Sequence, residues 1–339
     1  MQILDSQPAA SMIALPPKPP RSASAPEALK GSSYSMLSRI LLIVFGVWAC
    51  STSVIFLKAS TVHPILLAGY RCIVAATALA PFWVRDLRRH RGNYGLGHLR
   101  RTAMPAVFLA AHFSLWILGA RMTAAAHATL VVNTVPIVMP FLLYFMVRET
   151  VTRGEIIGTC FALLGVGLLT GSDLGVSRQY VLGDCICFAG MLMLAGYMAL
   201  GRKNRSFPTI WLYVVPLYAI AGMLCVMVGL VASLVTDIPL RLESGREILF
   251  ILGLGIFPTV IGHSTINYSL KHFRGQTISI VALGEFIFAG IMAFVLLDEV
   301  PHWPFYVAAG LVVVGVVLAV RAAPESTIQA ELTESPTDK

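Results

Sequence analysis

Ten apolar stretches, each long enough to cross a lipid bilayer, fill the chain from about Met36 to Arg321. A membrane-spanning helix needs roughly 20 mostly apolar residues, because the hydrocarbon core is about 30 Å thick and each residue rises about 1.5 Å. Charged residues make up only 12% of the chain, against about a quarter in soluble domains. The stretches lack the strict alternation of a transmembrane barrel, so we predict an all-α, polytopic membrane protein. The predicted spans are Ser38–Lys58, His63–Val84, Thr102–Ala120, Ala124–Val147, Gly154–Ser172, Val181–Gly201, Thr209–Val235, Glu247–Leu270, Gly275–Leu297 and His302–Val320.

The distribution of positive charge predicts the orientation of these spans. If the short loops join antiparallel neighbours, nineteen of the 25 lysines and arginines lie on the side of the two termini. Five lie on the other side, and Arg71 lies within a span. By the positive-inside rule, both termini are then cytoplasmic, and we expect a multi-pass protein of the inner (plasma) membrane. The net charge of +8 therefore reflects membrane topology, and we expect no nucleic-acid partner because no recognition module is visible.

The two ends of the chain have a different composition from the spans. Residues 1–35 are rich in proline, serine and alanine, and residues 322–339 are polar. We predict that both are disordered cytoplasmic tails. A signal peptide would begin with a short basic region and a hydrophobic core, whereas here the first long apolar run follows the tail, so we predict that the first span is an uncleaved anchor. All six cysteines fall within predicted helices, where buried cysteine usually acts as a small apolar residue. We expect no disulfide framework, no metal site and no cofactor.

An internal duplication divides the spans into two halves. Val147-Arg148-Glu149 and Leu297-Asp298-Glu299 are 150 residues apart, and Gly165-Val166 and Gly315-Val316 repeat the same offset. A unit of five helices is odd in number, so its second copy enters the membrane inverted. We therefore predict two inverted five-helix repeats, residues 36–173 and 180–321, an architecture that places substrate sites near the midplane between the repeats.

Several short motifs, in order, carry a resemblance to a known family. They are Pro64–Arg71 at the start of the second span, Thr134-Val135-Pro136 leading to Glu149, Leu283-Gly284-Glu285 leading to Glu299, and the glycine-valine pairs of the fifth and tenth spans. In this set the chain resembles EamA-type transporters of the drug/metabolite transporter superfamily, from about Met36 to Arg321. The resemblance implies a carrier for small metabolites, often an exporter, without naming a substrate.

Two charged residues within the spans are the first candidates for a substrate site. Arg71 lies about eight residues, or ~12 Å, from the outer end of its span. Its guanidinium could bind an anion or carboxylate through a bidentate fork, or it could form a structural pair or snorkel. Glu285 lies about ten residues, or ~15 Å, into its span. It could bind an amine or carry a proton, or it could be a protonated glutamate bonded to a neighbouring helix.

Uncharged polar and aromatic residues complete the candidate set. His112 and His263 lie within spans, and each could equally be a hydrogen-bonded packing residue. Asn267 shares a helix face with His263. Asn133 belongs to a stripe with Thr129, Pro136 and Pro140 that could line a pathway or serve helix packing. Trp116 is one of several aromatic residues that could form walls of a site or anchor the chain at the interface. The predicted substrate-binding residues are Arg71, His112, Trp116, Asn133, His263, Asn267 and Glu285.

Other classes of protein fit the sequence less well. There is no His-Glu-x-x-His, no complete nucleophile elbow and no glycine-rich phosphate loop, so an enzyme or an ATP-driven pump is weakly supported. A receptor or scaffold without transport would not require polar residues in five different spans. We therefore predict a secondary transporter that exports a small metabolite, and the leading candidate for this metabolite is an amino acid or a derivative. Its expected partners are this small molecule and the lipid bilayer, and a homodimer is left open.

Overall fold

The computed structural model describes residues 25–123, 125–171, 178–235, 242, 244–297 and 300–322. Glu299, residues 1–24 and residues 323–339 lie outside this part, and with them most of both expected tails. The chain forms two units, Met1–Arg39 and Ile40–Lys339. The first unit contains the beginning of α1 (Ala25–Ser51), and the second contains the rest of α1 and the other described helices.

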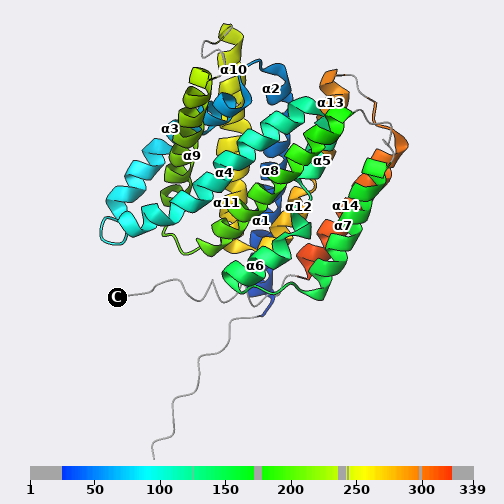
Figure 1. Ribbon diagram of the computed structural model, residues 1–339. Coiled ribbons are helices and arrows are strands. Elements are labelled where there is room, and N and C mark those ends of the chain that lie inside the picture. The colour runs from blue at the N-terminus through cyan, green and yellow to red at the C-terminus, as the bar shows by residue number, and fades with distance from the viewer. Residues whose placement is uncertain are drawn as a thin grey trace, which may run out of the picture. The chain divides into compact units, whose positions relative to one another are not determined.

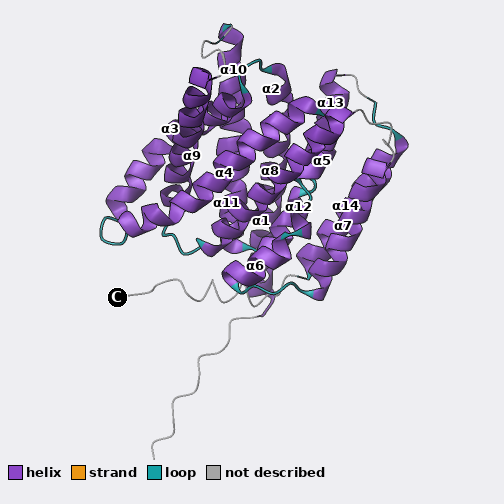
Figure 2. Ribbon diagram, viewed as in Figure 1, coloured by secondary structure: helices purple, strands orange, loops and turns teal. Residues whose placement is uncertain are grey.

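The described residues form helices joined by loops and turns, with no strand among them (Figure 2). Five of the helices run without a break through all or all but one residue of their predicted spans. These are α3 (Pro64–Arg89), α4 (Leu96–Met122), α8 (Arg178–Lys203), α9 (Ile210–Val235) and α14 (Trp303–Arg321). Another, α7 (Arg153–Gly171), ends where the described residues stop. Proline stands in the first turn of α3 and α14, where its missing N–H is not needed for the helix.

The other four predicted spans are interrupted. The first consists of α1 and α2 (Ser53–Ala59), and the eighth of α10 (Gly245–Leu254), the π-helical segment η2 (Gly255–His263) and α11 (Ser264–His272). The fourth consists of α5 (Ala125–Val132), the 3₁₀ turn η1 (Val135–Ile137) and α6 (Met139–Val147), and the ninth of α12 (Gly275–Ala282) and α13 (Glu285–Leu297). The first, eighth and ninth still run as single helical spans, as expected, whereas the fourth bends at its break.

Proline explains the sharpest of these interruptions. The segments Ala128–Ile137 and Met139–Val147 meet at an angle of 46°. Pro136 and Pro140 each lack the N–H that would continue the helical ladder, and each ring clashes with the preceding turn. The second segment ends at Arg148, which takes the left-handed conformation (φ 61°) and donates a hydrogen bond from its N–H to the carbonyl oxygen of Tyr144. The fourth span is therefore two half-helices.

Helices that are distant in the sequence pack side by side. The most extensive pairings join α4 to α8, α3 to α9 and α7 to α14, and Figure 1 shows the last two helices running alongside each other. Gly158 and Gly315 permit the close approach of α7 and α14, because a Cβ on either glycine would lie 2.5 Å from the other's carbonyl oxygen. In addition, α9 packs on α4 and η2 packs on α3, so these four elements surround one interior region.

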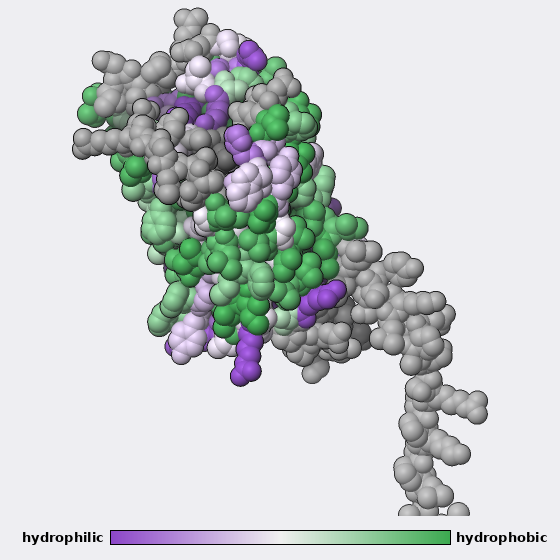
Figure 3. Space-filling model, turned by 90° about the vertical axis from the view of Figure 1, so that its right-hand side faces the viewer, coloured by the Kyte–Doolittle hydropathy of each residue, from purple (hydrophilic) through white to green (hydrophobic). Residues whose placement is uncertain are grey.

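The exterior of the bundle is apolar. Large side chains such as Phe141, Phe145, Met227, Leu234 and Trp303 are exposed, and Figure 3 shows a hydrophobic band between more polar ends on the face it displays. Among the described residues, eight helical segments are long and apolar enough to cross a membrane, and nine if the bent pair of the fourth span counts as one. The chain is thus an all-helical, multi-pass membrane protein.

Candidate functional site

Arg71 lies at the centre of the interior region between α3, α4, α9 and η2. Its side chain is completely buried, and its Nε donates a hydrogen bond to Oγ1 of Thr259 at 2.9 Å. The guanidinium carbon lies 3.8 Å from the centroid of the Phe113 ring, a cation–π contact. Both terminal nitrogens, Nη1 and Nη2, lack a hydrogen-bond partner. A buried cation with unused donors is expensive, and here it presents a preformed fork for an anion.

Two histidines flank the ring of Phe113. The His263 ring meets it edge-on at a centroid distance of 4.9 Å, and the His112 ring lies 5.1 Å from it. The backbone carbonyl oxygen of Gly190 lies 3.0 Å from Nδ1 of His112, whose ring stacks on Trp116 at 6.3 Å. Nδ1 of His263 and Nε1 of Trp116 are buried without partners. Both histidine rings thus contact the same phenyl ring that lies under the Arg71 guanidinium.

The interruptions of the fourth and ninth spans meet at a second polar contact. Asn133 follows α5 directly and Glu285 opens α13. Nδ2 of Asn133 donates to Oε2 of Glu285 at 3.2 Å and to the carbonyl oxygen of Thr129 at 2.9 Å. A carboxylate in the first turn of a helix is favoured by the helix dipole. Glu285 forms no ion pair with another described residue.

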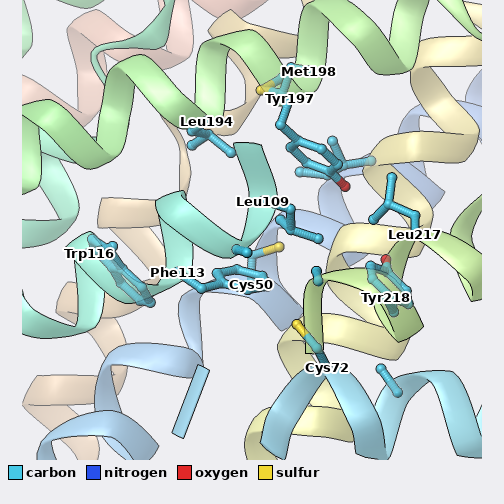
Figure 4. Packing of buried hydrophobic residues seen from close by; sticks show 14 of the residues in the cluster. Cys50, Cys72, Leu109, Phe113, Trp116, Leu194, Tyr197, Met198, Leu217 and Tyr218 are labelled. Atoms are coloured by element: carbon cyan, nitrogen blue, oxygen red, sulfur yellow. The ribbon is translucent and has the colours of Figure 1, made fainter. Parts of the chain in front are cut away.

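A hydroxyl and amide network adjoins Arg71 on the side of α9 and α11. Nδ2 of Asn267 donates to the hydroxyl of Tyr197 and, at 2.8 Å, to the carbonyl oxygen of His263. The hydroxyl of Tyr218 lies 3.2 Å from Oγ of Ser264. Figure 4 shows the hydroxyls of Tyr197 and Tyr218 directed toward the same interior region, beyond Phe113 and Cys50. Oδ1 of Asn267 has no partner.

Contacts therefore connect five of the seven residues selected from the sequence, and the other two, Asn133 and Glu285, form a separate hydrogen-bonded pair. Arg71, His112, Trp116, Asn133, His263 and Asn267 are buried, and Glu285 is partly exposed. Whether they bind substrate stays a prediction. Three further members were missed. Phe113 looks like any apolar core residue, although its position beside His112 was a signal. Thr259 lies in the π-helical segment η2, and the hydroxyl of Tyr218, on α9, donates to the carbonyl oxygen of Thr259 at 3.4 Å. Pro258 inside η2 was a sequence signal for this irregular segment.

Ionic and hydrogen-bonded contacts lie toward the two ends of the bundle. At one end, Nε of Arg202 lies 2.8 Å from the Glu149 carboxylate, and Nε of Arg274 lies 2.9 Å from that of Glu155. At the other end, Arg121 donates to three carbonyl oxygens, that of Leu57 in α2 and those of Ser60 and Val62 in the loop between α2 and α3. Glu247 accepts hydrogen bonds from Ser60 and Thr61 of the same loop. Within the described residues, no group of three His, Cys, Asp or Glu side chains could hold a metal ion.

Comparison with known proteins identifies the family of this bundle. A solved crystal structure, described only as that of a protein, aligns with a TM-score of 0.67 and 19% identity over 84% of this chain and 98% of its own, which shows the fold alone. An "Uncharacterized transporter" of Methanothermobacter thermautotrophicus strain Delta H is 23% identical over 287 residues, 79% of each chain. The sequence model of the EamA-like transporter family matches residues 37–171 and again residues 181–321. Because these matches cover most of the chain, this multi-pass membrane protein belongs to the EamA-like transporter family.

Proposed function

We propose that the chain is a secondary transporter that exports a small polar metabolite, an amino acid or a derivative, across the inner membrane by alternating access. The observation that carries the proposal is the Arg71 guanidinium, fully buried with two nitrogens unpartnered. A structural arginine in this interior would be expected to use its donors, because buried polar groups are normally hydrogen-bonded. A substrate carboxylate would satisfy both nitrogens of Arg71 at once.

The two charged groups of a zwitterion would bind at two different points, one at Arg71 and one at Glu285. A carboxylate on Arg71 would lie near Phe113 and the unpartnered Nδ1 of His263. An ammonium group would find the Glu285 carboxylate, which Asn133 holds at the start of α13. Trp116 and Phe113 supply apolar surface for the remainder of the molecule. This division of charge favours an amino acid over a simple anion.

Two inverted repeats would place such a site at their interface, and several observations support them. The family model matches the chain twice, at residues 37–171 and 181–321. The interruptions at Asn133–Thr134 and Leu283–Gly284 are 150 residues apart, which is the offset of the sequence duplication. Discontinuous helices at corresponding positions of two halves are a mark of transporter binding sites.

The pair formed by α7 and α14 obeys the same offset. Gly158 approaches Gly315, and Gly165 approaches Ala308, in each case with a carbonyl oxygen within 2.7 Å of a Cβ placed on the glycine. Adding 150 to residues 158 and 165 gives 308 and 315, the same two residues of α14. The crossing point therefore lies where a twofold axis between the repeats would pass. Ten spans in two repeats, with both termini cytoplasmic, are the arrangement we propose.

Alternating access would operate through the contacts at the two ends of the bundle. The ion pairs Arg202–Glu149 and Arg274–Glu155 would close one end, and Arg121 with Glu247 would close the other. To open one end, the contacts at that end must break while those at the other end remain. Such a change is a rocking of one bundle against the other. Either the substrate gradient or a proton gradient could drive the cycle.

Transport by purified protein tests this function. Proteoliposomes are loaded with a panel of radiolabelled amino acids, with and without a pH gradient, and efflux is followed for the wild type and for Arg71→Gln. We expect efflux of a subset of the panel that Arg71→Gln abolishes. The matched control is Arg88→Gln, an exposed arginine on the same helix, which should transport normally. Equal efflux by wild type and Arg71→Gln would refute the proposed site, and no efflux of any amino acid or derivative would refute the substrate class.

A further inference from the structure

Consecutive residues in the first turn of α12 bind the first half of the chain. The hydroxyl of Thr277 donates to Oε1 of Glu155 at 3.0 Å, and the backbone N–H of Gly275 donates to Oε1 of Glu149 at 3.0 Å. Gln276 lies between these two residues, is completely buried, and donates from its side chain to another part of the first half. Its partner is the interruption of the fourth span.

The Gln276 amide supplies a hydrogen bond that the fourth span cannot make for itself. In a continuous helix, the carbonyl oxygen of Pro136 would accept from the N–H four residues later, but that residue is Pro140, which has no N–H. Nε2 of Gln276 donates to this oxygen at 3.2 Å instead. A carbonyl oxygen can only accept, so the contact also fixes which end of the amide faces the fourth span.

The second hydrogen of this amide nitrogen is used as well. Nε2 of Gln276 lies 2.8 Å from Oγ1 of Thr159, whose own hydrogen goes to the carbonyl oxygen of Glu155 at 2.8 Å. Oγ1 of Thr159 therefore accepts from Gln276, and the amide joins α12 to both η1 and α7. Oε1 of Gln276 is buried without a partner. Within the described part of the chain, the two donated bonds thus hold this side chain in place.

Two hydrogen bonds therefore connect the interruption of the fourth span to both halves of the ninth. In one of them, Gln276 of α12 binds Pro136 in η1. In the other, Asn133 at the end of α5 binds Glu285, the first residue of α13. Asn133 precedes Pro136 by only three residues, so a shift of Pro136 away from α12 moves Asn133 as well.

We infer that Gln276 is a positioning residue of the transport site, because it holds the fourth span at Pro136 so that Asn133 meets Glu285. Glu285 is the carboxylate proposed above for the amino group of the substrate, so the inference rests on the proposed function. Gln276 acts through Asn133 and does not contact the substrate. Its loss therefore weakens binding of the amino group and spares binding of the carboxylate at Arg71.

A double-mutant cycle on thermal unfolding tests the link between Gln276 and Asn133. The unfolding midpoint is measured in one detergent for purified Gln276→Leu, Asn133→Ala and the double variant. Without Gln276, Asn133 is already displaced from Glu285, so the loss in the double variant should be at least about 2 °C smaller than the sum of the single losses. Additive losses would overturn the inference.

Thr277→Val supplies the matched control for this cycle. It removes a hydrogen bond from the same turn of α12, but that bond goes to Glu155 and not to η1. Its loss should add to that of Asn133→Ala. If Gln276→Leu cannot be purified, Gln276→Asn takes its place, because its amide is one methylene too short to reach Pro136.

Pro140→Ala tests whether the glutamine replaces the missing N–H. Alanine gives the Pro136 carbonyl oxygen a donor within its own helix. In the Pro140→Ala background, Gln276→Leu should therefore lower the unfolding midpoint by about half as much as in the wild type, or less. An equal loss in the two backgrounds would overturn the inference.

Transport kinetics supply a readout that a packing role would not change. Proteoliposomes are loaded with an amino acid that the wild type exports, and the analogue of this amino acid without the amino group is added as a competitor. We expect Gln276→Asn to raise KM for the amino acid about tenfold, the effect of one hydrogen bond to a charged group, with little change in the maximal rate. Inhibition by the analogue should be unchanged, because the analogue can bind Arg71 but has no group for Glu285. Equal weakening of both molecules, or an unchanged KM, would overturn the inference.

The result is separable from the fate of the proposed function, since the unfolding cycle requires no transport. Non-additive losses without efflux of any amino acid would keep Gln276 as the residue that positions Asn133 and would refute the transporter mechanism. Arg71-dependent efflux with additive losses would refute the role of Gln276 alone.

Discussion

Arg71→Met should leave the protein as stable as the wild type, or more stable, while it abolishes transport. The wild-type arginine has lost its hydration, a penalty of several kcal/mol for a buried ion, and has two unpartnered nitrogens. Against this stand one hydrogen bond to Thr259 and one contact with Phe113, together about 3–5 kcal/mol. Thr259 keeps its own bond to the carbonyl oxygen of Leu254 at 2.7 Å and is not orphaned. The balance for methionine lies between neutral and about 3 kcal/mol of added stability.

Arg202 supplies the matched control, because it is equally buried but fully engaged. Its Nε lies 2.8 Å from Glu149, and its Nη1 donates to the carbonyl oxygen of Leu270 at 3.0 Å. Arg202→Met would strand the Glu149 carboxylate, which is only 10% exposed, and should lower stability by about 3–5 kcal/mol.

The assay is thermal unfolding of the purified variants in one detergent, read as the midpoint of a cysteine-reactive or intrinsic fluorescence transition. A change of 1 kcal/mol shifts the unfolding midpoint of a large chain by about 2–4 °C. The midpoint of Arg202→Met should therefore lie at least about 6 °C below that of the wild type, whereas the midpoint of Arg71→Met should not be lowered. If both variants lose the same amount, Arg71 is satisfied in the resting protein, and the reasoning that makes it a binding group is wrong.

Three further predictions address charge, topology and packing. Glu285→Gln keeps the size of the side chain and an acceptor for Asn133 but cannot ionise. It should abolish or uncouple transport at normal membrane abundance, and unchanged transport with unchanged pH dependence would rule out a proton role. A cysteine at Arg91 should resist an impermeant thiol reagent in intact cells while one at Leu242 reacts, and the opposite pattern would reverse the orientation. Gly158→Ala should destabilise the protein by about 1–3 kcal/mol, because its Cβ would lie 2.5 Å from the Gly315 carbonyl oxygen. Gly167→Ala, with no neighbour within 4 Å, should be neutral in the same thermal assay.

Hydropathy located the helical segments well because burial in lipid demands long apolar runs whatever their tertiary contacts. It did not locate their interruptions. Pro136 and Pro140 were a sequence signal for the break between α5 and α6. No proline marks Leu283 and Gly284, where the helix breaks before Glu285. The π-helical segment η2 contains Pro258, which lacks the N–H of a regular helix, so the sequence carried a signal there that the predicted continuous span did not use.

The candidate site was partly predictable for a related reason. A polar residue in an apolar span stands out, so Arg71, His263 and Glu285 could be selected without a structure. Phe113 could not, because its function as the ring beneath a guanidinium is a matter of position among many similar side chains.

The glycine contact between α7 and α14 has a consequence for biosynthesis. Gly158 meets Gly315, so α7 leaves the ribosome about 150 residues before its partner, a wait of roughly 10–30 s at 5–20 residues per second. During that time its smooth face can pack only against lipid or against the insertion machinery. Nascent chains arrested before α14 should therefore be held by membrane chaperones or degraded, and release should coincide with synthesis of the last helix. The helix bundle can therefore be completed only when translation of the last helix has finished.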